Sequence, residues 1–404
     1  MKTIKQYLLI EKTYEVLLAL VLITIPLPYA FSSISIALLT AVSVFSVFFH
    51  KVKFRKELAL PILLYILVLA SLLWTINTGK SLRGIERQLP FLLLPLAFIC
   101  MPSISKEKLF NALYWFSAFM ALLAVFFICN GLVIYISEGT LSSLFYHNLV
   151  GPWQLNAIYV SLLVAVCLLF IIFYKKKTFL NIALGIILFI FLVLLSSKNV
   201  IFSTIICIML GFLVQRISLK KIAVLGTLVL IISAVVLLTP LKNRVQQEFS
   251  SNIEEVLTAE KFNRVYPWTG TTLRVYQGRI FYELIDKDEV FLTGYGINAA
   301  KEKRIEKNKE YNLYWGYDDY NFHNQFIQTF AEIGVIGFLL IVFMLGALFK
   351  GYVSKKELLF LFVAILMTMI FLTETYIWRQ RGMIHFLILY GILFKSLSFK
   401  NSAL

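Results

Sequence analysis

Residues 178–197 read TFLNIALGIILFIFLVLLSS, twenty residues without a charge, lying between Lys177 and Lys198. An α-helix needs about 20 consecutive apolar residues to cross the hydrocarbon core of a bilayer. Similar runs recur along the 404 residues, of which 60% are hydrophobic and only 15% are charged. A soluble chain carries roughly a quarter charged residues. The sequence therefore predicts an all-α polytopic membrane protein.

About twelve transmembrane helices are expected from the apolar runs. The first run follows Lys2, Lys5 and Lys12 but has no small-residue cleavage site, so we interpret it as a membrane helix and not as a removed signal peptide. The predicted spans are approximately 14–31, 32–49, 58–76, 88–101, 109–136, 153–174, 178–197, 199–217, 221–240, 326–349, 357–375 and 382–397.

The connections between spans predict the orientation of the chain. Alternate connections are short and basic, namely 51–56, 106–108, 175–177, 216–221 and 350–356. If both termini lie on one side, all of these connections share that side, and the positive-inside rule makes it cytoplasmic. We therefore predict a multi-pass protein of the bacterial inner membrane with both termini in the cytoplasm.

One connection, residues 241–325, is long and polar and falls on the outer side, between spans nine and ten. It is too long for a simple connector, so we expect a periplasmic cap subdomain. This divides the chain into 1–240 with helices one to nine, the cap 241–325, and 326–404 with helices ten to twelve.

Basic residues on the outer side are exceptions to the positive-inside rule and call for a physical explanation. Lys198 stands between two apolar runs without an acidic neighbour in the sequence. A charge at this depth costs a few kcal/mol, which favours a function over snorkelling to the headgroups. Several such cations meeting in space would suit a phosphate or diphosphate, and otherwise they are solvated or paired. The other outer cations of interest are Arg83, Arg87, Arg274, Arg279, Arg379 and Arg381.

A second cluster of polar residues precedes and enters the tenth span. His323 is either an interfacial hydrogen-bonding residue or a general base, and Asn324 follows it. Glu332 lies inside the apolar run and should be partnered or functional, although one continuous helix would not point it the same way as His323. The aromatic residues nearby indicate an interfacial belt or a platform for sugar rings. The aromatic residues are Trp315 and Tyr320, and the acidic residue Asp319 lies between them in the sequence.

Several common signatures are missing from the sequence. There is no P-loop, no Rossmann glycine pattern and no metal-ligand spacing of histidines and carboxylates. The four cysteines lie in apolar spans without pairing or ligand spacing. The net charge of +16 would suggest nucleic acid in a soluble chain, but here we expect no nucleic-acid partner, no metal and no cofactor.

Three segments resemble the O-antigen ligase and polymerase superfamily of bacterial envelope glycosyltransferases. They are Thr272-Leu273-Arg274, the bend Leu292-Thr293-Gly294-Tyr295-Gly296, and His323-Asn324-Gln325-Phe326 with Glu332-Ile333-Gly334 and Gly337 after it. In addition, Ser196-Ser197-Lys198 stands where many members carry a Thr-x-Ser/Thr-Arg element. Lysine keeps the charge there but loses the bidentate fork of arginine.

The resemblance implies a metal-independent, inverting transfer of a glycan from undecaprenyl diphosphate to an acceptor, among membrane lipids. It implies His323 as general base and Lys198, Arg274 and other outer arginines as partners of the diphosphate. The acceptor is the lipid A-core in ligases and a growing glycan in polymerases. Asn324, Glu332, Tyr320, Trp315 and Asp319 are expected to contact the glycan or support the site.

The single large loop late in the chain favours a ligase over a polymerase, although the two share fold and donor. A protein O-oligosaccharyltransferase is a third variant with a protein acceptor. A transporter or flippase is an alternative of another class, but such proteins usually show paired halves around a midplane site. The sequence shows no internal repeat, and its charges gather at the outer boundary.

Overall fold

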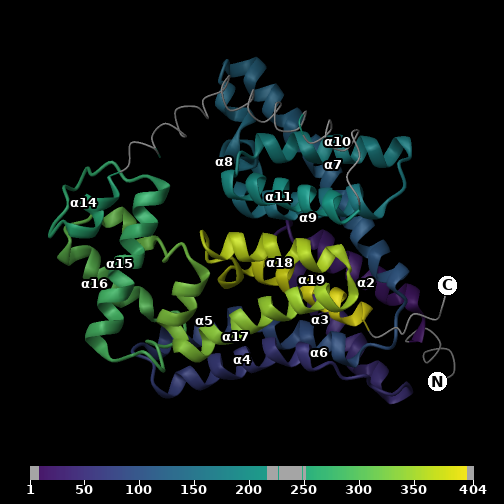
Figure 1. Cartoon of the computed structure of the whole chain (residues 1–404), viewed down its shortest axis with the longest axis horizontal. Helices are drawn as coiled ribbons and strands as arrows, with labels where there is room; N and C mark the ends of the chain where they lie inside the picture. Colours follow the sequence, from purple (N-terminus) through teal and green to yellow (C-terminus); the bar gives the residue numbers. More distant parts are fainter. Residues whose placement is uncertain (1–8, 216–225, 227–247, 249–251, 398–404) are drawn as a thin grey trace.

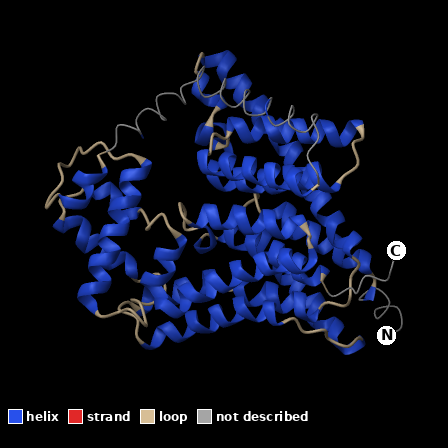
Figure 2. Cartoon of the chain, in the orientation of Figure 1, coloured by secondary structure: helices blue, strands red, loops and turns tan. Residues whose placement is uncertain are grey.

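The structure is a computed structural model that describes residues 9–215, 226, 248 and 252–397. Within these residues the chain is helical and has no strand (Figure 2). A helix covers each predicted span except 221–240, which lies outside the described residues.

The helices of the first part are α2 (Glu11–Thr24), α3 (Tyr29–Ser46), α4 (Ala59–Ala70), α5 (Thr78–Gln88), α6 (Pro90–Cys100), α7 (Lys106–Glu138), α8 (Tyr146–Leu149), α9 (Ala157–Tyr174), α10 (Phe179–Leu194) and α11 (Lys198–Val214). Those of the second part are α14 (Ile253–Thr258), α15 (Gly270–Asp288), α16 (Ala300–Glu310), α17 (Gln325–Lys355), α18 (Leu358–Phe371) and α19 (Gln380–Ser396). Short 3₁₀ turns are η1 (Val47–Phe49), η2 (Lys56–Leu58), η3 (Ser71–Leu73), η4 (Leu141–Leu144), η5 (Gly151–Trp153), η6 (Trp315–Asp319) and η7 (Tyr376–Trp378).

The lengths and surfaces of these helices fit a bilayer. Tyr29–Phe49, Lys56–Leu73, α7, α9 and α17 are long and apolar enough to cross one, and α10, α11 and α18 are shorter apolar helices. Large apolar side chains such as Ile136 and Phe179 are more than four-fifths exposed on the outside of the bundle. Extensive apolar surface of this kind is not stable in water but matches lipid. The chain is therefore a multi-pass membrane protein.

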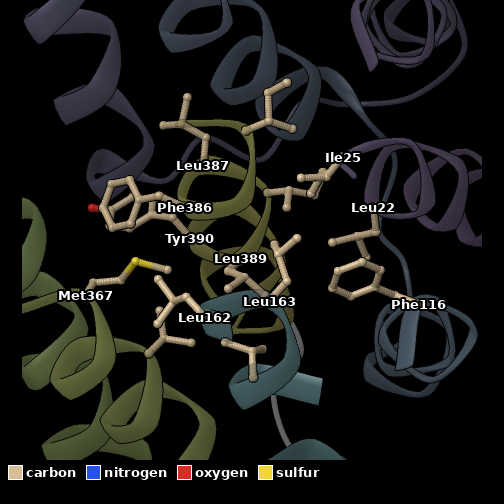
Figure 3. Close-up of a cluster of buried hydrophobic side chains, with 14 of the residues drawn as sticks. Leu22, Ile25, Phe116, Leu162, Leu163, Met367, Phe386, Leu387, Leu389 and Tyr390 are labelled. Atoms are coloured by element: carbon tan, nitrogen blue, oxygen red, sulfur yellow. The ribbon is translucent and has the colours of Figure 1, made fainter. Parts of the chain in front are cut away.

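Helix α19 forms the centre of the bundle. Every residue from Gly382 to Lys395 is buried, so the helix contacts protein on all sides. Figure 3 shows Phe386, Leu387, Leu389 and Tyr390 of this helix among side chains of α2, α7, α9 and α18. The stretch 386–394 is apolar all round and has no polar face to turn outward, which explains its place in the interior.

The two ends of the bundle differ in charge. At one end, here called the basic end, Glu357 before α18 accepts hydrogen bonds from Lys106 and Tyr174, and Lys108 pairs with Glu15 of α2 at 3.4 Å. Four of the predicted basic connections are described, and these contacts bring three of them, 106–108, 175–177 and 350–356, to this end. The loop before α7 also meets the start of α2 at this end, where the Ser105 hydroxyl donates a hydrogen bond to Glu11 (2.6 Å).

The opposite end, here called the cap end, carries residues 252–324. In Figure 1 the helices α14, α15 and α16 lie beyond the left ends of the roughly parallel bundle helices. They enclose a second hydrophobic core, centred on Phe262, Tyr276 and Tyr311. Its aromatic rings meet edge to face, for example Phe262 and Tyr276 at 5.7 Å between centroids. The cap therefore has a core of its own beside that of the bundle.

Helix α17 is interrupted near the cap end. Ile333 and Gly334 leave helical geometry, Gly334 with φ +71°, and the chain segment around Gly294 lies in the break. The carbonyls of Ala331 and Glu332 accept hydrogen bonds from the N–H groups of Tyr295 (2.9 Å) and Gly296 (2.8 Å). These two carbonyls have no helical N–H to accept from because of the break, and N–H groups of the cap take that place. The first turns of α17, which follow His323, are thereby fixed to the cap.

We expect Gly334→Ala to destabilise the protein by about 2–5 kcal/mol. An added Cβ at Gly334 would lie 2.0 Å from the carbonyl oxygen of Leu292, at a positive φ that already disfavours alanine. The measurement is thermal unfolding in detergent, followed by tryptophan fluorescence. Gly346→Ala is the matched control, because it lies in the same helix and a Cβ there meets nothing within 4 Å. Equal melting temperatures for the two variants would contradict this account of the break.

Candidate functional site

Two cavities adjoin at the cap end. The larger, of about 530 Å³, is lined by the turn 196–199, the start of α15 and the loop after α18, and we call it the Lys198 cavity. The smaller, of about 270 Å³, is the His323 cavity. Glu374 lines both of them. The carboxylate of Glu374 therefore forms part of the wall between the two cavities.

Glu374 lies between the cap and the start of α17. Its side chain is buried, and its Oε1 accepts a hydrogen bond from Arg274 Nη2 at 3.1 Å. Its Oε2 lies 3.7 Å from His323 Nδ1. Arg274 is held further by the carbonyls of Thr373 (2.9 Å) and Gly270 (2.9 Å). A cation, a carboxylate and a histidine from three separate segments thus form one chain of contacts.

His323 is held in an unusual backbone conformation. Its φ is +46°, which costs a residue other than glycine about 1–2 kcal/mol. The backbone N–H of His323 donates to Asn321 Oδ1 at 2.8 Å, and Asn324 caps α17 through Ile327 N at 3.1 Å. Both ring nitrogens of His323 are shielded from solvent and lack a hydrogen-bond partner among the described residues. The imidazole is therefore positioned by its backbone and has hydrogen-bonding capacity left for a substrate.

The Lys198 cavity is favourable for an anion. Two helices, α11 and α15, begin at its wall, after Ser197 and Thr269 respectively. Helix N-termini carry the positive end of the helix dipole. At the start of α15 the N–H groups of Thr271 and Thr272 are already bonded, to Glu248 (3.1 Å) and to the Thr269 hydroxyl (3.2 Å). Lys198 and Arg274 add two full positive charges to the same cavity. Together these groups could hold a phosphate or diphosphate.

Glu248 offsets part of this positive charge. Its Oε1 lies 3.6 Å from Lys198 Nζ, and its Oε2 accepts from Thr271 N at 3.1 Å. Burial alone would raise the pKa of Glu248, but the hydrogen bonds from Thr271 and the charge of Lys198 hold it below its usual value. Glu248 is therefore ionised at neutral pH, and an incoming diphosphate would compete with it for Lys198.

Arg379 and Arg381 line the His323 cavity and not the Lys198 cavity. Arg381 is tied to the 25–29 loop, with Nε donating to Ile25 O at 3.3 Å and the guanidinium lying over the ring of Tyr29 at 4.4 Å. Arg379 is exposed, and its side chain has no hydrogen bond or ion pair within the described part of the chain. Of the two, Arg379 is better placed to meet a ligand.

The structure does not bring Arg83, Arg87 and Arg279 to either cavity. Arg83 and Arg87 are exposed on α5. Arg279 belongs to the interior of the cap, where its guanidinium donates to Val256 O (2.9 Å) and pairs with Glu283 (3.0 Å). We assign Arg279 to the packing of the cap.

The supporting residues predicted from the sequence have different environments. Tyr320 contacts the His323 ring edge to face at 5.4 Å. Asp319 pairs with Lys301 at 2.8 Å and is 90% exposed, and Trp315 is 73% exposed. None of these three lines a cavity described here.

Glu332 is buried and fully partnered. Its carboxylate accepts from Gln328 Nε2 at 2.6 Å and from the indole of Trp378. It lines neither cavity and connects α17 to η7, just ahead of Arg379. Its contacts fit a structural role next to the site.

The sequence reading missed Glu374 and Glu248. The predicted span 357–375 placed Glu374 inside the membrane, whereas α18 ends at Phe371 and leaves Glu374 in the loop. An acidic residue at the end of an apolar run was the available signal, because it carries the same burial cost as Lys198. Nothing in the sequence around Glu248 indicates that it meets Lys198, fifty positions earlier.

A family model described as O-antigen ligase matches residues 182–342. The matched region includes Lys198, Glu248, Arg274 and His323. No curated protein matches the chain.

Proposed function

We propose that the chain belongs to the O-antigen ligase and polymerase superfamily, since an O-antigen ligase family model matches residues 182–342, and that it transfers a glycan from undecaprenyl diphosphate to the lipid A-core. The observation that carries this proposal is the junction of the two cavities at Glu374. One cavity holds Lys198 and Arg274 at the starts of two helices, where a diphosphate could replace their carboxylate partners Glu248 and Glu374. The other presents His323, whose ring nitrogens have no hydrogen bond among the described residues. A transfer of this kind needs both sites within reach of one reacting carbon.

In the proposed step, an acceptor hydroxyl oxygen attacks the anomeric carbon of the donor sugar. The bond between that carbon and the diphosphate oxygen breaks, and the electron pair leaves with the diphosphate. His323 takes the proton of the hydroxyl as it attacks. Attack on the face opposite the leaving group inverts the anomeric configuration.

The leaving diphosphate gains negative charge as the bond breaks. Lys198, Arg274 and the starts of α11 and α15 are preorganised to stabilise that charge in the Lys198 cavity. Because diphosphate is itself a good leaving group, the proposed step requires no metal and no nucleotide.

Glu374 is proposed as a positioning residue that acts through His323 and Arg274. When His323 takes a proton, the carboxylate 3.7 Å from Nδ1 would stabilise the resulting imidazolium. We expect Glu374→Gln to lower kcat by at least about 10-fold with little change in KM, since glutamine keeps the shape but not the charge. Glu310→Gln, which removes an exposed carboxylate of the cap, is the control. An unchanged kcat in Glu374→Gln would remove the positioning role.

For the orientation, we propose that the basic end is cytoplasmic and the cap end periplasmic in the bacterial inner membrane. The connections at the basic end carry the lysines that the positive-inside rule assigns to the cytoplasm. Both substrates are lipid-anchored and would reach the site from the outer leaflet.

The acceptor decides between ligase and polymerase, and the late position of the large loop favours ligase. The test is a lipopolysaccharide gel after deletion of the gene, complemented with wild type. Loss of glycan from the lipid A-core, with polymer accumulating on its carrier lipid, supports a ligase. Core capped by a single repeat supports a polymerase instead. An unchanged ladder overturns both and points to glycoproteins or to transport.

A further inference from the structure

Five rings form a continuous row on the cap, which we call the aromatic row: Trp315, Tyr314, Tyr317, Tyr320 and His323. Neighbouring centroids are 5.0 Å apart for Trp315 and Tyr314, and 6.4 Å apart for Tyr314 and Tyr317. The row continues at 5.3 Å to Tyr320 and at 5.4 Å to His323. It therefore connects an exposed tryptophan to the proposed general base without a gap.

The row is exposed and does not lie in the hydrocarbon core of a bilayer. Trp315 is 73% exposed, and Tyr314 and Tyr320 are each more than two-fifths exposed. Asp319, in the same 3₁₀ turn η6 as Trp315, has a 90% exposed side chain that pairs with Lys301. An ionised carboxylate at this place is incompatible with the apolar part of a bilayer. The rings therefore lie outside the hydrocarbon core, where a sugar chain can reach them.

The turn that carries the row is rigidly held from the inside of the cap. Arg304 is 1% exposed and donates to the carbonyls of Tyr317 (3.1 Å) and Asp318 (2.8 Å). Asn308 donates to Asp318 Oδ1 at 2.9 Å. Burial lowers the pKa of Arg304 to about 10, because taking the charged guanidinium out of water costs free energy. An ordinary turn on the surface needs no such buried arginine. The rings are thus preorganised, which reduces the entropy lost when a ligand binds to them.

We propose that the aromatic row binds the sugar chain of a substrate and guides it to His323. Sugar rings have apolar faces that pack on aromatic rings, and their hydroxyls can bond to the tyrosine hydroxyls and to Asp319. The inference rests on the proposed glycan transfer and adds a binding site for sugars beyond the reacting one. The chain bound could be the donor glycan or the oligosaccharide of the acceptor.

The test uses Trp315→Ala in the purified full chain in lipid vesicles. The probes are undecaprenyl-diphosphate-linked glycans of one and of several repeats, with rough lipopolysaccharide as acceptor. We expect KM to rise about 3- to 10-fold for the substrate whose sugar chain lies on the row, with kcat within about twofold. A rise confined to the longer donor assigns the row to the donor, and a rise in KM for the acceptor assigns it to the acceptor.

Two variants keep the result interpretable. Tyr282→Ala removes an aromatic side chain of the cap that is 72% exposed and outside the row, and it should match wild type. Trp315→Phe keeps an aromatic ring and should recover most of the wild-type KM. Unchanged KM values for donor and acceptor in Trp315→Ala, while His323→Ala is inactive, would overturn the aromatic row alone. Full activity of His323→Ala would instead overturn the proposed catalytic function.

Discussion

His323→Ala is expected to lower the rate of glycan transfer by about 10²- to 10⁴-fold, the usual contribution of a general base. The ring nitrogens lie beside the Glu374 carboxylate and have no partner among the described residues that would compete with a substrate. Because no hydrogen bond of the fold depends on the imidazole there, the variant should remain folded and inserted. The measurement is glycan transfer to lipid A-core in vesicles. Gel filtration in detergent checks that the variant is folded and not aggregated.

The backbone at His323 calls for a second variant. Its φ of +46° disfavours alanine, whereas asparagine adopts this region readily. His323→Asn should therefore fold as well as wild type and still be inactive, since an amide cannot take the proton. His50→Ala is the matched control: His50 lines neither cavity, its Nε2 is hydrogen-bonded to Ser46 Oγ at 3.1 Å, and its loss should leave transfer unchanged. Wild-type activity in His323→Asn would show that another group is the base.

Lys198→Ala is expected to lower kcat by about 10²- to 10³-fold, as removal of one preorganised charge partner of a leaving group usually does. Lys198 stands in the first turn of α11, so its ammonium and the helix N-terminus act on the same anion. The loss should appear mainly in kcat, because the charge on the diphosphate grows as the bond breaks. Single-turnover assays with a purified lipid-linked donor measure it.

Lys198→Arg should keep most of the activity, since it retains the charge and offers a fork to the diphosphate. Lys309→Ala removes a positive charge from an exposed position of α16 and controls for the general field of the cap. If Lys198→Ala and Lys309→Ala behaved alike, the diphosphate would have to bind elsewhere.

The membrane architecture is a local property of the sequence. A run of apolar residues long enough to cross a bilayer must form a helix there, because lipid offers no partner for backbone polar groups. This is why a helix occupies each predicted span within the described residues. The ends of the spans were less well determined: the predicted 357–375 stops as α18 at Phe371. Those few residues decide that Glu374 belongs to the site.

The choice among the outer cations needed the tertiary structure. Arg274 and Arg279 lie five residues apart on α15, which places them about 140° apart around the helix. One therefore reaches Glu374 and the Lys198 cavity, and the other reaches the interior of the cap. The sequence contains both arginines in similar surroundings, and only the packing of α15 distinguishes them.

Apolar runs and their charged boundaries were enough to predict a helical, membrane-embedded chain and to identify His323, Lys198 and Arg274 as the residues to examine. This is possible because the free energy of placing an apolar or a charged residue in a membrane depends mainly on its own segment. The contacts of Arg274 with Glu374, a hundred positions later, and of Glu374 with His323 became visible only in the packed fold. The break of α17 at Gly334 was decided in the same way, by hydrogen bonds to a distant segment of the cap. Such contacts depend on how separate elements pack, and no single stretch of sequence contains that information.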